Sequence, residues 1–427
     1  MATTIILPGT KITAEEKTDQ LFGLELEVKA STRVDPRARA TGQEKDHPLS
    51  GADETDVIEL QYENGITRWV TIELLRQEGE APTAREVRLP ATISTGDPSR
   101  GLVGDLALKA LKVFGIKLPD KIADKGAREI AEYFESQLKP GPGLYRLTDP
   151  NQIVAKIEKP GELRSTKPYL LFLHGTASST SGSFGKMAGT PEWEKLAQAY
   201  PERILGLEHL TFSQSPVANL TAIVDLLPQD ARLHLVSHSR GGLVGDLLCL
   251  SGAAKSRDRF EDLARKYKES KREKDLVALR DLWDKLLEKR IQIERFVRVA
   301  CPARGTTLAS KRIDLIMTAL LNAFGLIPGL AENPIYDFAK ATLLALVKKR
   351  SDPKDLPGIE AMMPDSPLVY FLNHPDLRTT SDLAVIAGDI EMGSISSTLL
   401  TMAANTFFWA KNDLVVNTTA MYGGIRR

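Results

Sequence analysis

The chain has 427 residues, a length that favours two compact units or one unit with large insertions. Hydrophobic residues make up 42% of it, which supports a buried core and excludes disorder along most of the length. The 56 Lys and Arg residues balance the 56 Asp and Glu residues. The composition therefore provides no net field that would recruit nucleic acid or an acidic surface.

The two cysteines, Cys249 and Cys301, lie inside apolar runs, which is typical of buried thiols in a reducing compartment. The N-terminus has no basic flank followed by an apolar signal core. Residues 313–330 are largely apolar, but Gly325 and Pro328 interrupt a stretch that approaches the ~20 residues of a membrane span. We therefore expect a cytoplasmic protein without a transmembrane span, and a buried or lid helix in this stretch.

Residues 1–100 are predicted to be β-rich. Two β-favouring runs, 57–62 and 66–72, are separated by a segment that contains Asn64-Gly65. Both residues of an Asn-Gly pair tolerate positive φ, so this pattern predicts a β-hairpin. Residues 31–54 are dominated by Asp, Arg, Pro, Gly, Ser and Thr, and they predict a mobile loop.

A helical connector is predicted for residues 101–143. Apolar residues recur there at helical spacing in two stretches. The two sets are Leu106, Ala110, Val113 and Phe114, followed by Ile130, Tyr133, Phe134 and Leu138. Alternating Pro and Gly at residues 140–143 then indicate a turn or a domain boundary.

Residues 144–427 are predicted to form one α/β domain. Parallel strands that are covered on both faces need continuous apolar runs of a few residues rather than alternation. Such runs occur at residues 169–173, 204–207, 233–236, 296–300 and 383–387. Their alternation with helical stretches predicts a doubly wound, mostly parallel sheet.

Two helical insertions interrupt this alternation. Residues 252–293 are densely charged, with Leu and Trp at helical spacing, which predicts surface helices with one apolar stripe. A partner-binding arm is the alternative. Residues 311–350 form the second insertion, which includes the apolar stretch. The chain has no fixed-period repeat, no Gly-rich phosphate loop and no His, Cys, Asp or Glu cluster with metal-ligand spacing, so we expect neither cofactor nor metal.

Ser239 is the predicted nucleophile. It lies in Ser-His-Ser-Arg-Gly-Gly, after the apolar run 233–236 and before a helical stretch that includes Leu243. Strand, sharp turn and helix in this order lift a serine hydroxyl above the sheet, and the residues two before and two after it must be small. Gly241 meets this condition, and Ser237 stands where glycine is usual but is also small. A serine in a tight turn without chemistry is the alternative.

His174-Gly175-Thr176 follows the apolar run 169–173 and opens a series of small residues. Acyl transfer needs N–H groups directed at the oxyanion of the tetrahedral intermediate. One such donor comes from the residue after the nucleophile, here Arg240, and the second from the loop after an earlier strand. Thr176 is therefore the second predicted donor, and Gly175 permits the backbone to approach closely.

These segments resemble serial landmarks of the lipase-like α/β-hydrolases. The landmarks are Phe-Leu-His-Gly at 172–175, the turn at Ser239, Ala-Cys-Pro-Ala-Arg-Gly-Thr at 300–306 and Asn-Asp-Leu-Val-Val at 412–416. The phrases Leu-His-Gly-Thr-Ala-Ser-Ser-Thr and His-Ser-Arg-Gly-Gly-Leu-Val are similar to lipase-like domains of large bacterial proteins that often carry a caspase-like (CHAT) domain. The resemblance implies an α/β-hydrolase that acts on an ester or acyl substrate, lipids included.

The other two members of a catalytic triad are less well defined. In this fold the chain order is Ser, then Asp, then His. Asp413 matches the Asn-Asp landmark and is the predicted acid, while Asp389, after the run 383–387, is the alternative. No histidine follows Asp413, and His374 lies in Asn-His-Pro, which predicts a turn.

Two functions therefore stay open. The first is a serine hydrolase of the esterase or lipase type, whose general base comes from beyond residue 427 or from a partner protein. A peptidase is a variant of this function, because the same triad cleaves amides. The second is a catalytically inactive, hydrolase-fold interaction module of a larger bacterial signalling or defence protein. The missing histidine motivates the second.

Overall fold

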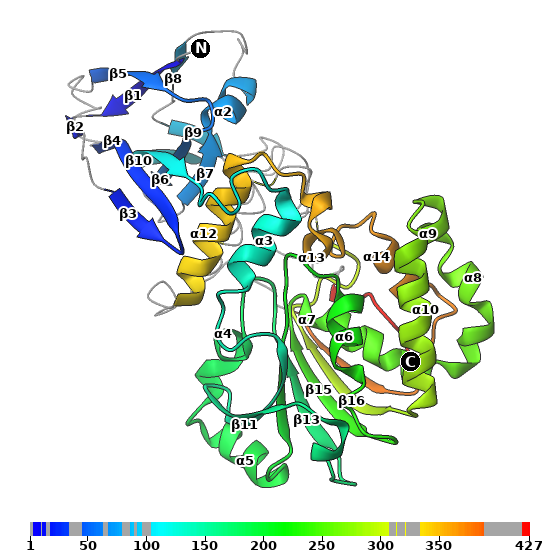
Figure 1. Ribbon diagram of the computed structural model, residues 1–427. Coiled ribbons are helices and arrows are strands. Elements are labelled where there is room, and N and C mark those ends of the chain that lie inside the picture. The colour runs from blue at the N-terminus through cyan, green and yellow to red at the C-terminus, as the bar shows by residue number, and fades with distance from the viewer. Residues whose placement is uncertain are drawn as a thin grey trace. The chain divides into compact units, whose positions relative to one another are not determined.

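The computed structural model describes residues 3–9, 11–13, 18–33, 45–62, 67–78, 86–88, 92–95, 104–306, 313, 321, 334–387 and 421–427 (Figure 1). The chain forms two compact units, each from three segments. The first contains Met1–Phe134, Ser310–Pro353 and Ile390–Val415; the second contains Glu135–Ala309, Lys354–Asp389 and Val416–Arg427. The whole of the predicted insertion at 311–350 therefore belongs to the first unit.

The first unit contains two sheets. The smaller has the order β5-β1-β8, with β1 (Thr3–Gly9), β5 (Lys45–Ala52) and β8 (Glu86–Arg88). The larger has the order β2-β4-β10-β6-β7, with β3 beside β4 and β9 beside β10. Its strands are β2 (Lys11–Thr13), β3 (Thr18–Leu21), β4 (Leu24–Arg33), β6 (Val57–Tyr62), β7 (Thr67–Thr71), β9 (Thr92–Thr95) and β10 (Gly104–Lys117). The predicted hairpin is confirmed, because β6 and β7 pair in antiparallel fashion.

Two predictions for this unit are wrong. The stretch with Leu106, Ala110, Val113 and Phe114 is the long strand β10, not a helix. Its pairing is irregular between Leu108 and Ala110 and between Val113 and Phe114. Each irregularity shifts the two-residue alternation by one, which leaves apolar residues at spacings that resemble those of a helix. The predicted loop at 31–54 is wrong at its two ends, where residues 31–33 belong to β4 and residues 45–52 form β5; residues 34–44 lie outside the described residues.

Three helices complete the described part of the first unit: α2 (Ile72–Glu78), α3 (Ala127–Glu135), whose last residue belongs to the second unit, and α12 (Pro334–Lys348). The helix predicted around Ile130 is thus confirmed. In α12, Phe338, Leu344 and Val347 are at most 1% exposed, and the helix contacts β3, β6, β7 and β10. The helix expected at residues 313–330 is a separate segment, of which only Ile313 and Leu321 belong to the described residues. Among the described helices, none combines the length and apolar character that crossing a bilayer requires.

The second unit is built on a seven-stranded sheet with the order β12-β11-β14-β13-β15-β16-β17. Strands β13 to β17 run parallel, and β11 pairs in antiparallel fashion with β14 and β12. The strands are β11 (Gly143–Asp149), β12 (Gln152–Ile157), β13 (Tyr169–Leu173), β14 (Ile204–Glu208), β15 (Arg232–His238), β16 (Gln292–Val299) and β17 (Asp382–Ile386). Each apolar run predicted to be a strand coincides with one, but the run at 383–387 forms the edge strand β17, which is exposed or half-buried and not buried as predicted. The β11–β12 hairpin was not predicted, because β12 is mostly exposed and has no apolar run.

Helices lie on both sides of this sheet (Figure 1). They are α4 (Thr180–Phe184), α5 (Pro191–Ala199), α6 (Pro216–Val224), α7 (Gly241–Leu248), α8 (Phe260–Leu263), α9 (Arg265–Glu269), α10 (Glu273–Glu288), α13 (Pro357–Glu360) and α14 (Pro367–Leu372). Short 3₁₀ helices span Pro160–Glu162, Gly185–Met187, Cys249–Gly252, Ala254–Arg259 and Pro353–Asp355. Both α5 and α6 begin with Pro after a Thr190 or Ser215 cap, whose hydroxyl accepts a backbone N–H of the first turn.

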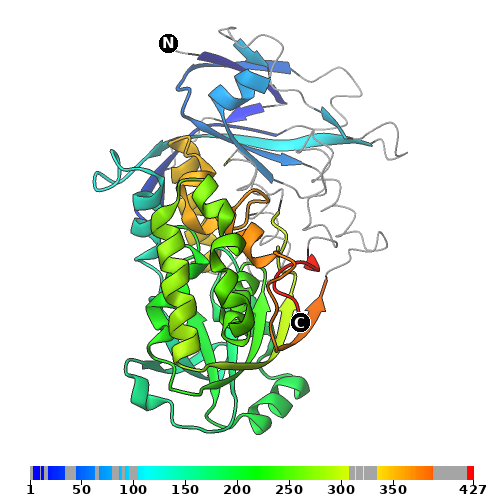
Figure 2. The same cartoon turned by 90° about the vertical axis from the view of Figure 1, so that its right-hand side faces the viewer.

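The charged insertion folds back onto the second unit. Its longest helix, α10, buries Leu279, Leu282, Trp283 and Leu286, and the Trp283 indole donates to Leu250 O at 2.8 Å. The predicted surface helices with one apolar stripe are therefore confirmed. In Figure 2 the yellow-green α10 lies in front of the sheet.

The order of the strands marks the place where a site is expected. The connection after β13 leads to β14 on one side, whereas the connection after β15 leads to β16 on the other. Ligand sites of open α/β sheets form outside the carboxyl ends of the strands at such a change of direction. Ser239 directly follows the end of β15, and Gly175 lies two residues after the end of β13.

Candidate active site

Ser239 occupies a strained turn between β15 and α7. Its φ is +51°, in the left-handed region that residues with a Cβ rarely adopt. The turn is held from both sides, because Ser239 N–H donates to Val299 O and Gly242 N–H donates to Ser239 O, each at 2.9 Å. The Ser239 side chain is partly exposed, and its hydroxyl has no hydrogen-bond partner among the described residues. Strain of this kind clusters at functional sites.

Two glycines let the loop after β13 lie against this turn. A Cβ added to Gly241 would stand only 2.2 Å from Leu173 O, so this position accepts glycine alone. A Cβ added to Gly175 would stand 3.0 Å from Ser239 Cβ and 3.1 Å from His238 Nδ1. The structure thus brings the predicted glycine and the predicted nucleophile into contact. Ser237, two residues before Ser239, is fully buried.

The two predicted oxyanion donors are Thr176 N–H and Arg240 N–H. Neither donates to an acceptor within the part of the chain that the structure describes. The Thr176 side chain is buried and its hydroxyl donates to Met362 Sδ at 3.4 Å, which leaves only its backbone group for another partner. The next residue, Ala177, has a φ of +51°, which turns the chain sharply beside Gly175.

The Arg240 side chain has a role that sequence reasoning missed. It is fully buried, with Nε donating to Gly358 O at 3.2 Å and Nη2 donating to Gln214 O at 2.6 Å and Asn219 Oδ1 at 2.9 Å. Burial lowers the pKa of this guanidinium to about 10, so it still carries its charge at neutral pH. The residue whose N–H is the predicted donor is therefore anchored by its own side chain.

Glu135 is a second residue that sequence reasoning missed. Its buried carboxylate accepts the backbone N–H groups of Thr211, Phe212 and Ser213 at 2.6, 2.8 and 3.1 Å, and the Ser213 hydroxyl as well. Burial raises the pKa of Glu135, while these hydrogen bonds act in the opposite direction. Thr211 Oγ1 in turn accepts the N–H of Ala177 at 3.0 Å, so the Glu135 carboxylate supports the loop that carries Thr176.

No histidine of the chain is hydrogen-bonded to the Ser239 hydroxyl. All six lie in the described residues: His47, His174, His209, His234, His238 and His374. The rings of His174 and His209 stack with centroids 3.9 Å apart, and His174 Nε2 accepts the backbone N–H of His209 at 3.2 Å. His238 Nδ1 lies 3.4 Å from Ser183 Oγ. Burial lowers the pKa of all three, so they are neutral at pH 7 and support the loops.

The predicted acid, Asp413, and its alternative, Asp389, lie outside the described residues. Residues 421–427 are described, and a buried ion pair holds them. Arg298 Nη1 contacts Asp246 Oδ1 and Oδ2 at 3.1 and 3.0 Å and donates to Gly423 O at 2.8 Å. Burial raises the pKa of Asp246 to about 6. The pair fastens the red C-terminal segment of Figure 2, which lies beside β17 and is joined to it by an Arg427–Asp382 ion pair.

Within the described ranges, no group of three or more His, Cys, Asp or Glu side chains is arranged to hold a metal ion.

A comparison with curated proteins found no match. A comparison with protein families found one whose description is a domain of unknown function, DUF7379; its model matches residues 144–262 and 276–426. The match includes both the loop around Gly175 and the turn at Ser239, and it omits residues 263–275. The chain therefore belongs to the DUF7379 family.

Proposed function

We propose that this protein is a serine hydrolase of the esterase or lipase type, built on a doubly wound α/β-hydrolase fold, with Ser239 as its nucleophile. One observation carries the proposal: Ser239 has a left-handed φ between a central parallel strand and a helix, with Gly175 in contact with it. This backbone geometry costs stability, on the order of 1–3 kcal/mol, and has no structural purpose that glycine would not serve better.

In the proposed reaction the Ser239 hydroxyl oxygen adds to the carbonyl carbon of an ester or other acyl substrate, and its proton passes to a general base, which later gives it to the leaving group. The oxyanion of the tetrahedral intermediate accepts hydrogen bonds from Arg240 N–H and Thr176 N–H, each contributing about 3 kcal/mol of transition-state stabilisation. The bond to the leaving group then breaks, the leaving group takes up a proton, and an acyl group remains on Ser239. Water releases the acyl group by the same route. Asp413 is the proposed acid of the triad.

A non-catalytic interaction module is the second candidate. The observation that favours it is the Ser239 hydroxyl, which has no histidine partner although all six histidines are described. Removal of a triad member leaves a serine hydrolase only about 10³–10⁴-fold above the rate in water. A module of this kind would retain the strained turn at Ser239 without hydrolysing a substrate. The resemblance to domains of larger bacterial proteins fits either candidate.

Labelling with a fluorophosphonate separates the two candidates. The full chain is incubated with the probe, and intact mass and peptide mapping locate the adduct. We expect one adduct, on Ser239, that is absent from Ser239→Ala and retained in Ser270→Ala, which removes an exposed serine elsewhere in the second unit. A folded chain that stays unlabelled, judged by circular dichroism, would overturn the hydrolase and favour the module. Hydrolysis of p-nitrophenyl acetate, butyrate and octanoate then ranks acyl lengths.

A further inference from the structure

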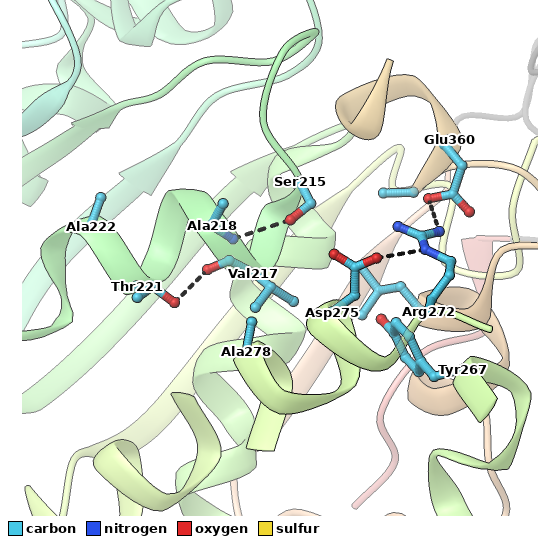
Figure 3. Close-up of a pocket in the computed structure, with 12 residues that line it drawn as sticks. Ser215, Val217, Ala218, Thr221, Ala222, Tyr267, Arg272, Asp275, Ala278 and Glu360 are labelled. Carbon is cyan, nitrogen blue, oxygen red and sulfur yellow. Dashed lines mark hydrogen bonds and ion pairs between the residues drawn. The ribbon is translucent and has the colours of Figure 1, made fainter. Parts of the chain in front are cut away.

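The second unit contains a surface groove that is separate from the Ser239 turn. Its volume is about 390 Å³, and it runs between α6, α9, α10, α13 and α14 (Figure 3). Its lining includes three alanines and four polar residues: Ala218, Ala222, Ala278, Tyr267, Arg272, Asp275 and Glu360. Tyr267, Arg272 and Asp275 come from residues 263–275, which the family model does not match.

One end of the groove is apolar. Ala218 and Ala222 on α6 and Ala278 on α10 line this end, and their exposed methyl groups leave open the space that longer side chains would fill (Figure 3). Leu368 on α14 and Val217 add apolar surface. Binding sites for small molecules combine such apolar walls with a few well-placed polar groups, in volumes of roughly 300–1,000 Å³.

The other end of the groove carries an excess of negative charge. Arg272 Nε donates to Asp275 Oδ2 and Arg272 Nη1 contacts Glu360 Oε2, both at 2.7 Å (Figure 3). Two carboxylates thus share one guanidinium, so the group has a net charge of about −1 at neutral pH. Both carboxylates already contact Arg272, so a bound anion would be repelled by them and would find the charge of Arg272 compensated. A bound cation would be attracted by the remaining negative charge of the two carboxylates.

Tyr267 provides an independent indication of a ligand. The residue is only 3% exposed and lines the groove, yet its hydroxyl has no hydrogen-bond partner among the described residues. Solvent reaches this hydroxyl through the groove, so a ligand bound there can form a hydrogen bond with it in place of water. Burial raises the pKa of Tyr267, so the hydroxyl stays protonated and neutral, able to donate or accept.

We propose that this groove binds a small organic ammonium ion with an apolar body. The ammonium group is placed beside the Tyr267 hydroxyl and the two carboxylate oxygens that Arg272 does not contact, Glu360 Oε1 and Asp275 Oδ1, which offer acceptors for its N–H donors. The apolar body lies along the alanines of α6 and α10. This site is beyond the proposed hydrolase function and does not depend on it.

Binding is tested with three probes of similar shape and different charge: phenethylamine, 2-phenylethanol and 3-phenylpropionate. Each is titrated into the full chain at pH 7 by isothermal calorimetry, with saturation-transfer NMR as a second readout. We expect phenethylamine to bind at least about tenfold more tightly than the alcohol, and the carboxylate to bind weakest. Equal affinities for the amine and the alcohol, or no binding by the amine, would overturn the proposal.

Four variants locate the site. Ala222→Leu and Ala278→Leu fill the apolar end, and each should weaken phenethylamine binding by about tenfold. Glu360→Gln should remove the preference for the amine over the alcohol, and Tyr267→Phe should weaken amine binding by about fivefold. Ala222 and Ala278 are exposed, so these two variants test the site without disturbing the core.

Two matched controls come from α10 and from the connection between α13 and α14. Val277→Leu adds bulk to the exposed side of α10 outside the groove, and Asp365→Asn removes an exposed carboxylate that pairs with Lys354. Both should bind phenethylamine like the unmodified chain. An amine affinity that is unchanged in Ala222→Leu and Ala278→Leu would place the binding elsewhere and refute the groove as the site.

Discussion

The hydroxyl of Thr211 accepts the backbone N–H of Ala177 at 3.0 Å, and this hydrogen bond joins the loop after β14 to the loop after β13. Both residues are buried, so no water replaces the bond if it is lost. On the far side, the backbone of Thr211 is held by Glu135. The Thr176 N–H is therefore positioned by a carboxylate that does not touch it.

Thr211→Val tests this relationship. Valine keeps the shape of threonine but leaves Ala177 N–H buried without an acceptor, which costs about 1–3 kcal/mol of stability. We expect slower fluorophosphonate labelling of Ser239 in a chain that still folds, measured together with urea unfolding. Thr221→Val is the control, because Thr221 is exposed on α6 and its hydroxyl donates only within that helix. Equal labelling rates in the two variants would contradict the proposed support.

Gly175→Ala tests the contact between the two loops. The new Cβ would stand 3.0 Å from Ser239 Cβ, closer than side chains normally pack, so the turn or the loop must move. We expect labelling of Ser239 to slow by at least about tenfold and stability to fall by about 1–3 kcal/mol. Gly161→Ala serves as the control, since nothing lies within 4 Å of the added methyl group there. A labelling rate like that of the control would show that the contact is loose.

Ser239→Gly should exchange function for stability. Glycine adopts positive φ without the steric cost of a Cβ, whereas Ser239→Ala keeps that cost. We expect both variants to lose labelling, and Ser239→Gly to be more stable than Ser239→Ala by about 1 kcal/mol in urea unfolding. Equal stability of the two variants would argue that the backbone strain at this position is negligible.

Arg298→Met tests the buried ion pair. Asp246 is fully buried, so removal of Arg298 leaves a carboxyl group without its charge partner, at a cost of about 3–5 kcal/mol. Because Arg298 also holds Gly423 O, the amides of Gly424 and Ile425 should exchange hydrogen faster. Arg290→Met, which breaks the exposed Arg290–Asp230 pair, should leave the free energy of unfolding almost unchanged, because solvent screens that pair. Similar losses in both variants would mean that burial does not distinguish the pairs.

The stacked histidines predict a dependence of stability on pH. Burial lowers the pKa of His209 well below that of an ordinary histidine, so the unfolded chain takes up a proton first as the pH falls. The contribution of neutral His209 to the free energy of unfolding is therefore complete above pH 6.5 and is lost as the pH falls. We expect the unmodified chain to lose more stability between pH 7.5 and 5.5 than His209→Gln does, by urea unfolding at each pH. His374→Gln, at a partly exposed position, should follow the unmodified chain.

The features that the sequence predicted correctly are encoded by neighbouring residues. Buried parallel strands need continuous apolar runs, so the run at 169–173 identified β13 directly. The turn at Ser239 is likewise local, because a strand, the small residues Ser237 and Gly241 and a helix follow one another within a few positions. The helical prediction for β10 failed although it was also local, since the irregular pairing with β4 and β6 disguises the alternation of a strand.

By itself, the sequence determined the central strands, the strained serine turn and the glycine that approaches it. Only the tertiary structure decided what holds them. Glu135 meets Thr211 across 76 residues, and nothing in its amphipathic helix marks it as an acceptor. The Arg240 side chain and the α12 helix found their partners in the same way. Hydrogen bonds and packing between distant segments depend on which elements become neighbours, and that choice is made by the whole fold rather than by local spacing.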